Sequence, residues 1–280
     1  MIAELDLPLA VPRTPPPSEP PSEPPLSRLT ATISASRLGC WLQCRLKFFF
    51  RYVKKIAKPN TPALHIGSVA HLVLQQWNLA RWRREPFHIE RFQVLYYSQW
   101  TELQKEAKID WQGEEATELS SSWLALEHYF RETPIKADER PEGVEVYVET
   151  DLARHGLNTL VGVLDLVRAG SRIVDFKNSG KTPDPTQVLH QHEIQLTCYG
   201  LLYRDATGRT ESGFELHHLV RTKTPKFVLS AMGPVSEGQQ TRLFRQIESY
   251  LVGVEAEDYV PSPSFGCAGC EFHTECRLWH

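Results

Sequence analysis

The hydrophobic pattern of the chain changes its period near residue 140, and this change narrows the choice of fold. Before it, apolar residues recur at helical spacing, whereas Val144, Val146 and Val148 alternate with polar residues as on a half-buried strand. Further strands are predicted over 157–167, 171–177, 213–220 and 226–232, and helices over 187–204 and 236–250. Helices, a three-strand meander, a helix and more strands together predict a mixed α/β domain.

The folded part is predicted to begin near Thr30. Residues 1–29 contain a tract of mostly Pro, Ser and Glu, 12–25, which cannot bury enough apolar surface to offset its ordering entropy. We therefore expect a disordered tail over 1–29 and one domain over 30–280. Further helices are predicted after the N-capping residues Ser34 and Ser36, over 64–84 and over 89–131.

The protein is expected to be soluble and cytoplasmic. The sequence has no apolar run near the roughly 18 residues that cross a bilayer, and its N-terminus lacks the basic flank and apolar core of a signal peptide. Without a secretion signal, the six cysteines are not expected to form a disulfide framework.

Basic residues are concentrated in one stretch, although the net charge is only −3. Between Pro24 and Arg84 there are eleven Lys and Arg residues and no Asp or Glu, and the remainder is strongly acidic. Such a stretch suits a polyanion such as DNA or RNA, or it forms a solvated basic helix without a ligand. The candidate contacts are Arg37, Lys47, Arg51, Lys54 and Lys55.

Two predicted neighbouring strands each carry an aspartate. Asp165 lies on the first strand, and Asp175-Phe176-Lys177 on the second, where Asp175 and Lys177 share a face and Phe176 points into the core. If the strands pair through their short turn, the carboxylates meet, and their repulsion is relieved by a divalent cation such as Mg²⁺ or Mn²⁺. Taken alone, such a triplet more often consists of strand-end acids and a surface lysine, because charged pairs at strand ends are common.

Two helical motifs strengthen the case for a site. His71 follows Gly67 by one helical turn, and Gln195 and Tyr199 lie one turn apart on a single helix face. Taken alone, His71 also fits a core histidine, and Gln195 and Tyr199 also fit ordinary surface residues. The informative feature is their order, which is helix-His, strand-Asp, strand-Asp-x-Lys, helix-Gln-x-x-x-Tyr.

The C-terminus contains three closely spaced cysteines. Cys267, Cys270 and Cys276 have the spacing of thiolate ligands for an iron–sulfur cluster or for zinc. Four thiolates serve either metal, so the spacing does not distinguish them. A fourth ligand must come from elsewhere, and the upstream candidates are Cys40 and Cys44.

This ordered set resembles the RecB-like branch of the PD-(D/E)XK nuclease superfamily, and more closely its iron–sulfur members related to CRISPR-associated exonucleases and the AddB nuclease domain. The resemblance covers most of 33–279, although Arg45 stands where the family usually has a proline after the cysteine. It implies a restriction-endonuclease-like core, in which helices flank a mixed central sheet and a cysteine cluster joins the N- and C-terminal segments.

The resemblance also implies roles for these residues. His71, Asp165, Asp175 and the backbone carbonyl of Phe176 would bind Mg²⁺ or Mn²⁺, and Lys177 would orient the attacking water. Gln195 and Tyr199 would support the site and touch the DNA. The ligands of a [4Fe-4S] cluster, or of zinc as the alternative, would be Cys44, Cys267, Cys270 and Cys276, with Cys40 as the rival to Cys44.

The implied function is metal-dependent hydrolysis of DNA phosphodiester bonds, by an exonuclease acting on single-stranded ends in repair, recombination or CRISPR adaptation. A helicase or a CRISPR integrase would be a fitting partner. Two alternatives remain open at this stage. One is a DNA-binding accessory subunit without catalytic activity, and the other is an iron–sulfur redox protein whose acids are structural.

Overall fold

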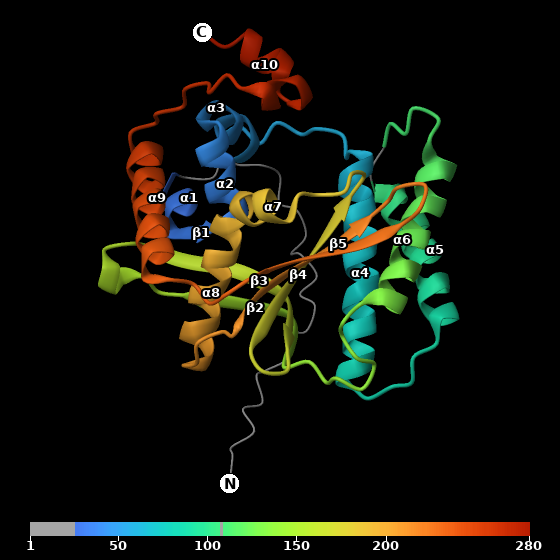
Figure 1. The fold of residues 1–280 in the computed structure, drawn as a ribbon. Helices are drawn as coiled ribbons and strands as arrows, with labels where there is room; N and C mark the ends of the chain where they lie inside the picture. The colour runs from blue at the N-terminus through green and yellow to red at the C-terminus, as the bar shows by residue number, and fades with distance from the viewer. Residues whose placement is uncertain (1–25, 107–108) are drawn as a thin grey trace.

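A six-stranded mixed sheet forms the centre of the computed structural model, which describes residues 26–106 and 109–280 (Figure 1). The strand order is β1-β3-β4-β5-β6, with β2 paired to β3. Pairs β1–β3 and β4–β5 are parallel and the others antiparallel, so the predicted meander is β2-β3-β4. The strands are β1 (Thr32–Ser34), β2 (Gly143–Thr150), β3 (Thr159–Arg168), β4 (Arg172–Ser179), β5 (Gly213–Val220) and β6 (Lys226–Met232). The predicted mixed α/β fold is confirmed.

Helices cover both faces of this sheet (Figure 1). On one face lie α1 (Leu26–Ala31), α2 (Ala35–Gln43), α7 (Pro185–Gln191), α8 (Glu193–Thr207) and α9 (Glu237–Glu255). On the other lie α4 (Pro62–Trp82), α5 (Ile89–Glu106) and α6 (Glu115–Glu132). Two short elements follow α2, namely α3 (Arg45–Phe48) and the π-helix η1 (Phe49–Val53). Two more lie near the C-terminus, η3 (Phe265–Gly269) and α10 (His273–Arg277). A 3₁₀ turn, η2 (Ala153–His155), lies between β2 and β3.

Each helical layer buries its own apolar core against the sheet. The first core includes Trp41 and Tyr250, and the second includes Trp77 and Phe176, all almost fully buried. In the first layer α9 approaches α2 closely at Gly253, where an added Cβ would lie 2.2 Å from a Trp41 ring carbon. The two cores hold α8 and α4 against opposite faces of β4, and this fixes the frame of the site.

The structure differs from the sequence prediction at four places, the first of which is the helical stretch predicted over 89–131, which is divided into α5 and α6. The expected tail over 1–29 is wrong at its end, because α1 begins at Leu26 and buries Leu29 in the core. The rest of that prediction, 1–25, lies outside the described residues. The helix predicted over 187–204 is broken at His192, and the basic stretch is interrupted at the extended residue Cys44.

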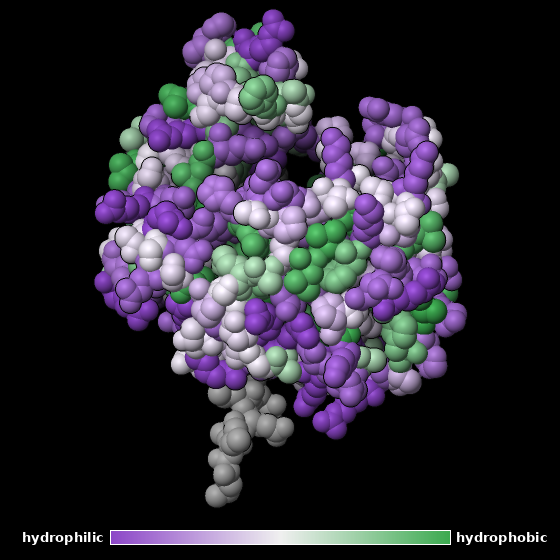
Figure 2. Space-filling view, viewed as in Figure 1, coloured by the Kyte–Doolittle hydropathy of each residue, from purple (hydrophilic) through white to green (hydrophobic). Residues whose placement is uncertain are grey.

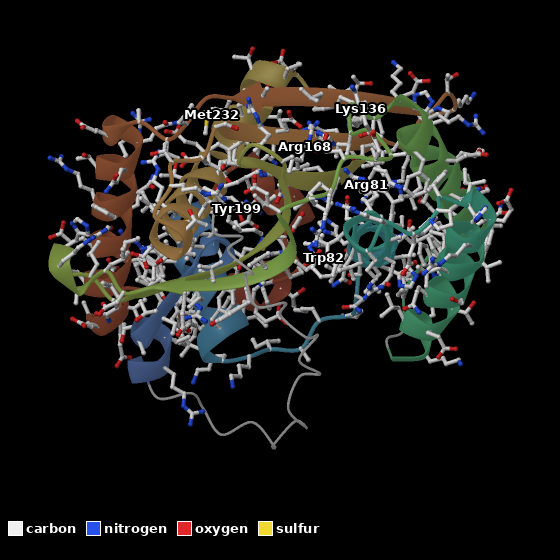
Figure 3. All side chains as sticks on the ribbon, turned by 90° about the horizontal axis from the view of Figure 1, so that it is seen from below. Arg81, Trp82, Lys136, Arg168, Tyr199 and Met232 are labelled. Carbon is white, nitrogen blue, oxygen red and sulfur yellow. The ribbon has the colours of Figure 1, made fainter. Side chains whose placement is uncertain are left out.

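A buried polar chain ties the second helical layer to the sheet. Tyr129 on α6 hydrogen-bonds to Nδ1 of His217 (2.8 Å), and Nε2 of His217 lies 3.0 Å from Glu215. Arg168 donates to Glu215 (2.9 Å) and to both carboxylate oxygens of Glu139. Arg168 and Arg81 lie where the helices meet the sheet (Figure 3). Since this network is buried, its groups depend on one another for hydrogen bonds.

Glu215→Gln is therefore expected to lower the free energy of unfolding by about 2 kcal/mol, because it removes a charge that serves both Arg168 and His217. Urea unfolding would measure the change. The matched control is Glu127→Gln, which breaks an exposed helical pair with Arg131 and should cost under about 0.5 kcal/mol. Equal losses in the two variants would contradict a structural role for the buried chain.

Candidate functional site

Three acidic residues form a row across three adjacent strands. The β3–β4 turn contains Gly170 and Ser171, both at left-handed φ, and sets the register in which Asp165 stands opposite Asp175. In the antiparallel pair β2–β3, the neighbours Val144↔Leu166 and Val146↔Leu164 bracket Glu145, so Glu145 stands opposite Asp165. The meander thus brings the two predicted aspartates together and adds a third carboxylate.

Helix α4 contributes His71 to the same row. Its Nδ1 lies 3.4 Å from Oδ2 of Asp165, and its Nε2 lies 3.0 Å from the carbonyl oxygen of Phe176. His71, Glu145 and Asp165 each offer a ligand atom within 4.8 Å of the others. The donor set of one imidazole and two carboxylates, with a backbone carbonyl beside it, is suited to Mg²⁺ or Mn²⁺.

Glu145 is the site residue that the sequence prediction missed. Its signal was present, since Glu145 alternates with the apolar valines of the predicted strand, but Glu149 has the same pattern. Only the register of β2 against β3 separates them. The structure adds another mark, because Glu145 has a φ of 49°, which side chains rarely adopt within a strand. Such strain is typical of residues held in place for function.

The carboxylates destabilise one another electrostatically. Burial and the neighbouring Asp175 charge raise the pKa of Asp165 to about 6. Burial and the charges of Asp165 and Asp175 raise the pKa of Glu145 to about 8. A buried and a half-buried acid whose pKa values are both raised mark a place where a cation would be favoured, so the residues present fit a divalent metal.

Stability is expected to fall with pH in metal-free protein. The folded state holds the protons of Glu145 and Asp165 to higher pH than the unfolded chain does, so the free energy of unfolding decreases as pH rises from about 4 to 8. The two pKa shifts together correspond to a loss of several kcal/mol. Thermal melts in EDTA would show it, and Mg²⁺ should raise the melting temperature more at pH 8 than at pH 5. A melting temperature independent of both would contradict the cation site.

Asp175 is held from the α8 side. Its Oδ1 accepts a hydrogen bond from Nε2 of Gln195 (2.8 Å), and its Oδ2 lies 2.7 Å from Nζ of Lys177. Gln195 also accepts from Lys177 (3.0 Å) and donates to the hydroxyl of Tyr199 (2.8 Å). Burial raises the pKa of Tyr199, so its hydroxyl stays neutral. The four predicted residues form one hydrogen-bonded unit, with the lysine ammonium fixed beside the carboxylate row.

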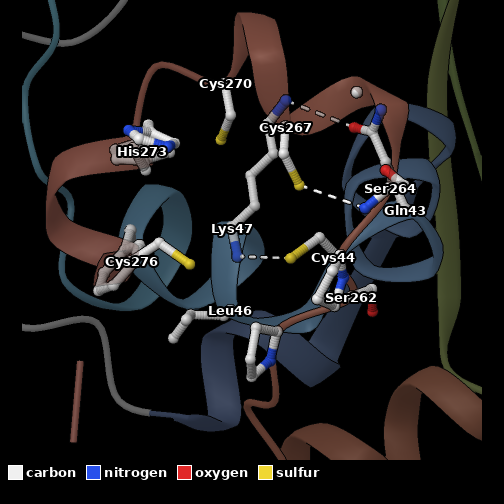
Figure 4. Close-up of a pocket in the computed structure, with 15 residues that line it drawn as sticks. Gln43, Cys44, Leu46, Lys47, Ser262, Ser264, Cys267, Cys270, His273 and Cys276 are labelled. Carbon is white, nitrogen blue, oxygen red and sulfur yellow. Dashed lines mark hydrogen bonds between the residues drawn. The ribbon is translucent and has the colours of Figure 1, made fainter. Parts of the chain in front are cut away.

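The cysteines form a second site at the joined chain ends. Cys44, Cys267, Cys270 and Cys276 line a cavity of about 80 Å³, with their sulfur atoms turned toward its middle (Figure 4). Burial and the nearby Cys44, Cys270 and Cys267 raise the pKa of the Cys276 thiol. Cys40 is buried in the core and does not line the cavity. The fold thus brings Cys44, and not Cys40, to the three C-terminal cysteines.

The C-terminal segment is also pinned to the N-terminal helices without any metal. Trp279 packs on Phe49 and Phe50 with ring centroids 4.9 and 5.8 Å apart. Glu271 pairs with Lys47 and Arg51, and Glu275 pairs with Lys58. Figure 2 shows the surface hollowed between this segment and the upper end of the second helical layer.

The five predicted DNA contacts lie in different surroundings, some engaged within the protein and some exposed. Arg37 donates to the backbone carbonyls of Leu29 and Thr32, and Lys47 and Arg51 face Glu271. Lys54 and Lys55 are exposed at the end of η1. Part of the basic stretch thus serves the fold, and the contact of all five with DNA stays a prediction.

Comparisons with known proteins bear on the family and the fold. Residues 32–277 match the profile of the PD-(D/E)XK nuclease superfamily. The fold is similar to that of a candidate exonuclease from Eubacterium rectale, with a TM-score of 0.62 and 13% identity over 91% of this chain and 90% of that one. A second solved structure, SSO0001, has a TM-score of 0.44 at 14% identity, with 89% and 86% of the chains covered. No curated protein matches the sequence. Among the described helices, none is long and apolar enough to cross a membrane.

Proposed function

The chain belongs to the PD-(D/E)XK nuclease superfamily, and from this premise we propose that it is a metal-dependent deoxyribonuclease that acts on single-stranded DNA ends. The observation that supports the proposal most is the row of Glu145, Asp165 and Asp175 with Lys177 fixed beside it. Because every position of the unit is filled by a chemically competent side chain, a catalytically inactive accessory subunit is the weaker alternative.

The residues of the row divide the work. His71, Glu145, Asp165 and the Phe176 carbonyl would hold Mg²⁺ or Mn²⁺, with Asp175 as a further ligand. A metal bound there supplies Lewis acidity, which lowers the pKa of a water molecule and stabilises charge on the phosphate. Lys177, held by Asp175 and Gln195, donates to the attacking water or to a phosphate oxygen. Tyr199 fixes Gln195, and through it the lysine.

We also propose that the four clustered cysteines hold a [4Fe-4S] cluster, with Zn²⁺ as the alternative. The cluster would join residues 44 and 267–276, far from the carboxylate row in sequence. Its role would be to hold the two chain ends together. We assign it no redox role, because the acids and Lys177 form a complete hydrolytic unit without it.

The exposed Lys54 and Lys55, beside the joined chain ends, would guide the strand by contacts to its phosphates. A cytoplasmic role in repair, recombination or CRISPR adaptation, beside a helicase or an integrase, is consistent with this activity. The resemblance of the motifs to RecB-like and AddB-like nucleases is part of the same proposal.

End-labelled single- and double-stranded DNA, incubated with anaerobically purified protein and Mg²⁺, Mn²⁺ or EDTA, would test the activity. We expect stepwise shortening from one end of the single strand, which EDTA prevents. DNA that stays intact with each metal, while binding remains salt-sensitive, would support the accessory-subunit alternative.

A further inference from the structure

Two histidines lie on the side of Lys177 that is away from the acidic row. Strand β5 follows β4 in the sheet, and in this parallel pair Lys177 and His218 are register partners. Partners in register project from the same face of a sheet. His218 is 2% exposed, and its Nε2 has no hydrogen-bond partner among the described residues. A buried ring nitrogen without a partner is costly unless it serves a ligand or positions another group.

His192 lies at the break between α7 and α8, three residues before Gln195, which holds Lys177. Its side chain is half-buried and interacts electrostatically with Lys177 and His218. Burial, aided by the Lys177 charge, lowers the pKa of both histidines, that of His218 to about 4. Both rings are therefore neutral at pH 7, and each can donate one N–H.

The two acids that flank His192 on α7 and α8 are engaged elsewhere. Glu193 pairs with Arg242 and with His190, and Asp184 caps the start of α7 by accepting from Thr186 and Gln187. The active site is thus divided, with the carboxylates on β2, β3 and β4 and nitrogen donors on the β5 and α7–α8 side. Two strand spacings, about 10 Å, separate Asp165 on β3 from His218 on β5. One phosphate group does not span that distance.

We propose that His192, with Lys177 and His218 behind it, forms a subsite for the phosphate next to the one that is hydrolysed. The inference rests on the proposed function and names a contact within it. His192 donates to a non-bridging oxygen of that neighbouring phosphate. His218 lies beneath this contact and is too deeply buried to reach substrate itself.

The test uses short single-stranded oligonucleotides in which one linkage at a time is a neutral methylphosphonate. In wild-type protein, substitution at one linkage beside the cleaved bond should lower kcat/KM about 10-fold. His192→Ala should show the same 10-fold loss on unmodified DNA and no further loss at that linkage. His192→Gln, which keeps a donor, should recover part of it. Anisotropy titrations of the same oligonucleotides in EDTA give a second readout that needs no turnover.

His190→Ala is the matched control, because His190 lies two residues away on α7 with an exposed ring. It should leave both readouts unchanged. The subsite is overturned if His192→Ala has no effect, or if its loss is the same at every linkage, as a general folding defect would give. If wild-type protein binds but cleaves no DNA, the proposed function fails, whereas the anisotropy pattern still decides whether His192 contacts a phosphate.

Discussion

Asp165→Asn is expected to lower kcat/KM for DNA cleavage by about 10³-fold and, at the same time, to stabilise the metal-free protein. Asp165 is central in the row, between Glu145 and Asp175, and its Oδ2 lies beside His71. Removing its charge removes a cation ligand and also the repulsion that raises the pKa of Glu145. Loss of activity together with a gain in stability would identify Asp165 as a functional residue, because replacing a purely structural acid would lower both the activity and the stability of the protein.

Cleavage of labelled DNA and urea unfolding in EDTA, measured on the same preparation, would check both halves of this prediction. Asn is isosteric and retains an oxygen to accept from the backbone N–H of Phe176, so the local fold should survive. Glu149→Gln, on the same strand as Glu145 but exposed, serves as the control and should change neither property. Full activity in Asp165→Asn would exclude the row as the catalytic centre.

Lys177→Ala tests the other half of the site and should reduce cleavage by a factor of about 10² to 10³ while DNA binding persists. Asp175 and Gln195 are the two residues that hold Nζ of Lys177, so removal of the lysine side chain leaves the carboxylate row in place. Retained cleavage would show that the water is oriented by another group.

The central sheet shows most clearly how much of the structure can be predicted from the sequence. The boundaries of β5 and β6 and the pairing of Asp165 with Asp175 follow from period-two alternation and from a short turn, which are local signals. Glu145 does not follow, because its neighbour across the sheet is set by the whole β2–β3 register. The break at His192 was also missed, since the polar residues on either side of it continue a helical pattern without any Gly or Pro.

The basic stretch shows the converse limit. Its composition predicted a polyanion surface, yet Lys47 and Arg51 face Glu271, some 220 residues later in the chain. Charge counted along a sequence says nothing of an acid that folding brings back to it. The same long-range contact makes the cysteine pattern informative, because it brings Cys44 to the three C-terminal cysteines.

If the proposed cluster is present, replacing Cys44 by Ser should remove it, reducing iron from about four atoms per chain to nearly none and lowering the melting temperature by about 10 °C. The Sγ of Cys44 also caps α3 by accepting from the Lys47 backbone N–H (3.5 Å), and a serine oxygen can keep that bond. Loss of iron would then reflect the missing thiolate and not a lost cap. Iron and sulfide analysis of anaerobically purified protein would measure it.

Cys40→Ser is the matched control, one helical turn away in the same segment. Cys40 is 6% exposed in the core, so serine there should cost about 1 kcal/mol and leave the iron content unchanged. Iron lost from Cys40→Ser but kept in Cys44→Ser would reverse the assignment of the fourth ligand. A colourless wild-type protein that contains zinc would show that Zn²⁺ occupies the site in place of the cluster. In either variant the aromatic contacts of Trp279 and the Glu271 and Glu275 ion pairs persist. Loss of the proposed cluster should consequently loosen the C-terminal segment, detected as proteolysis within 260–280, before it unfolds the sheet that carries the acidic row.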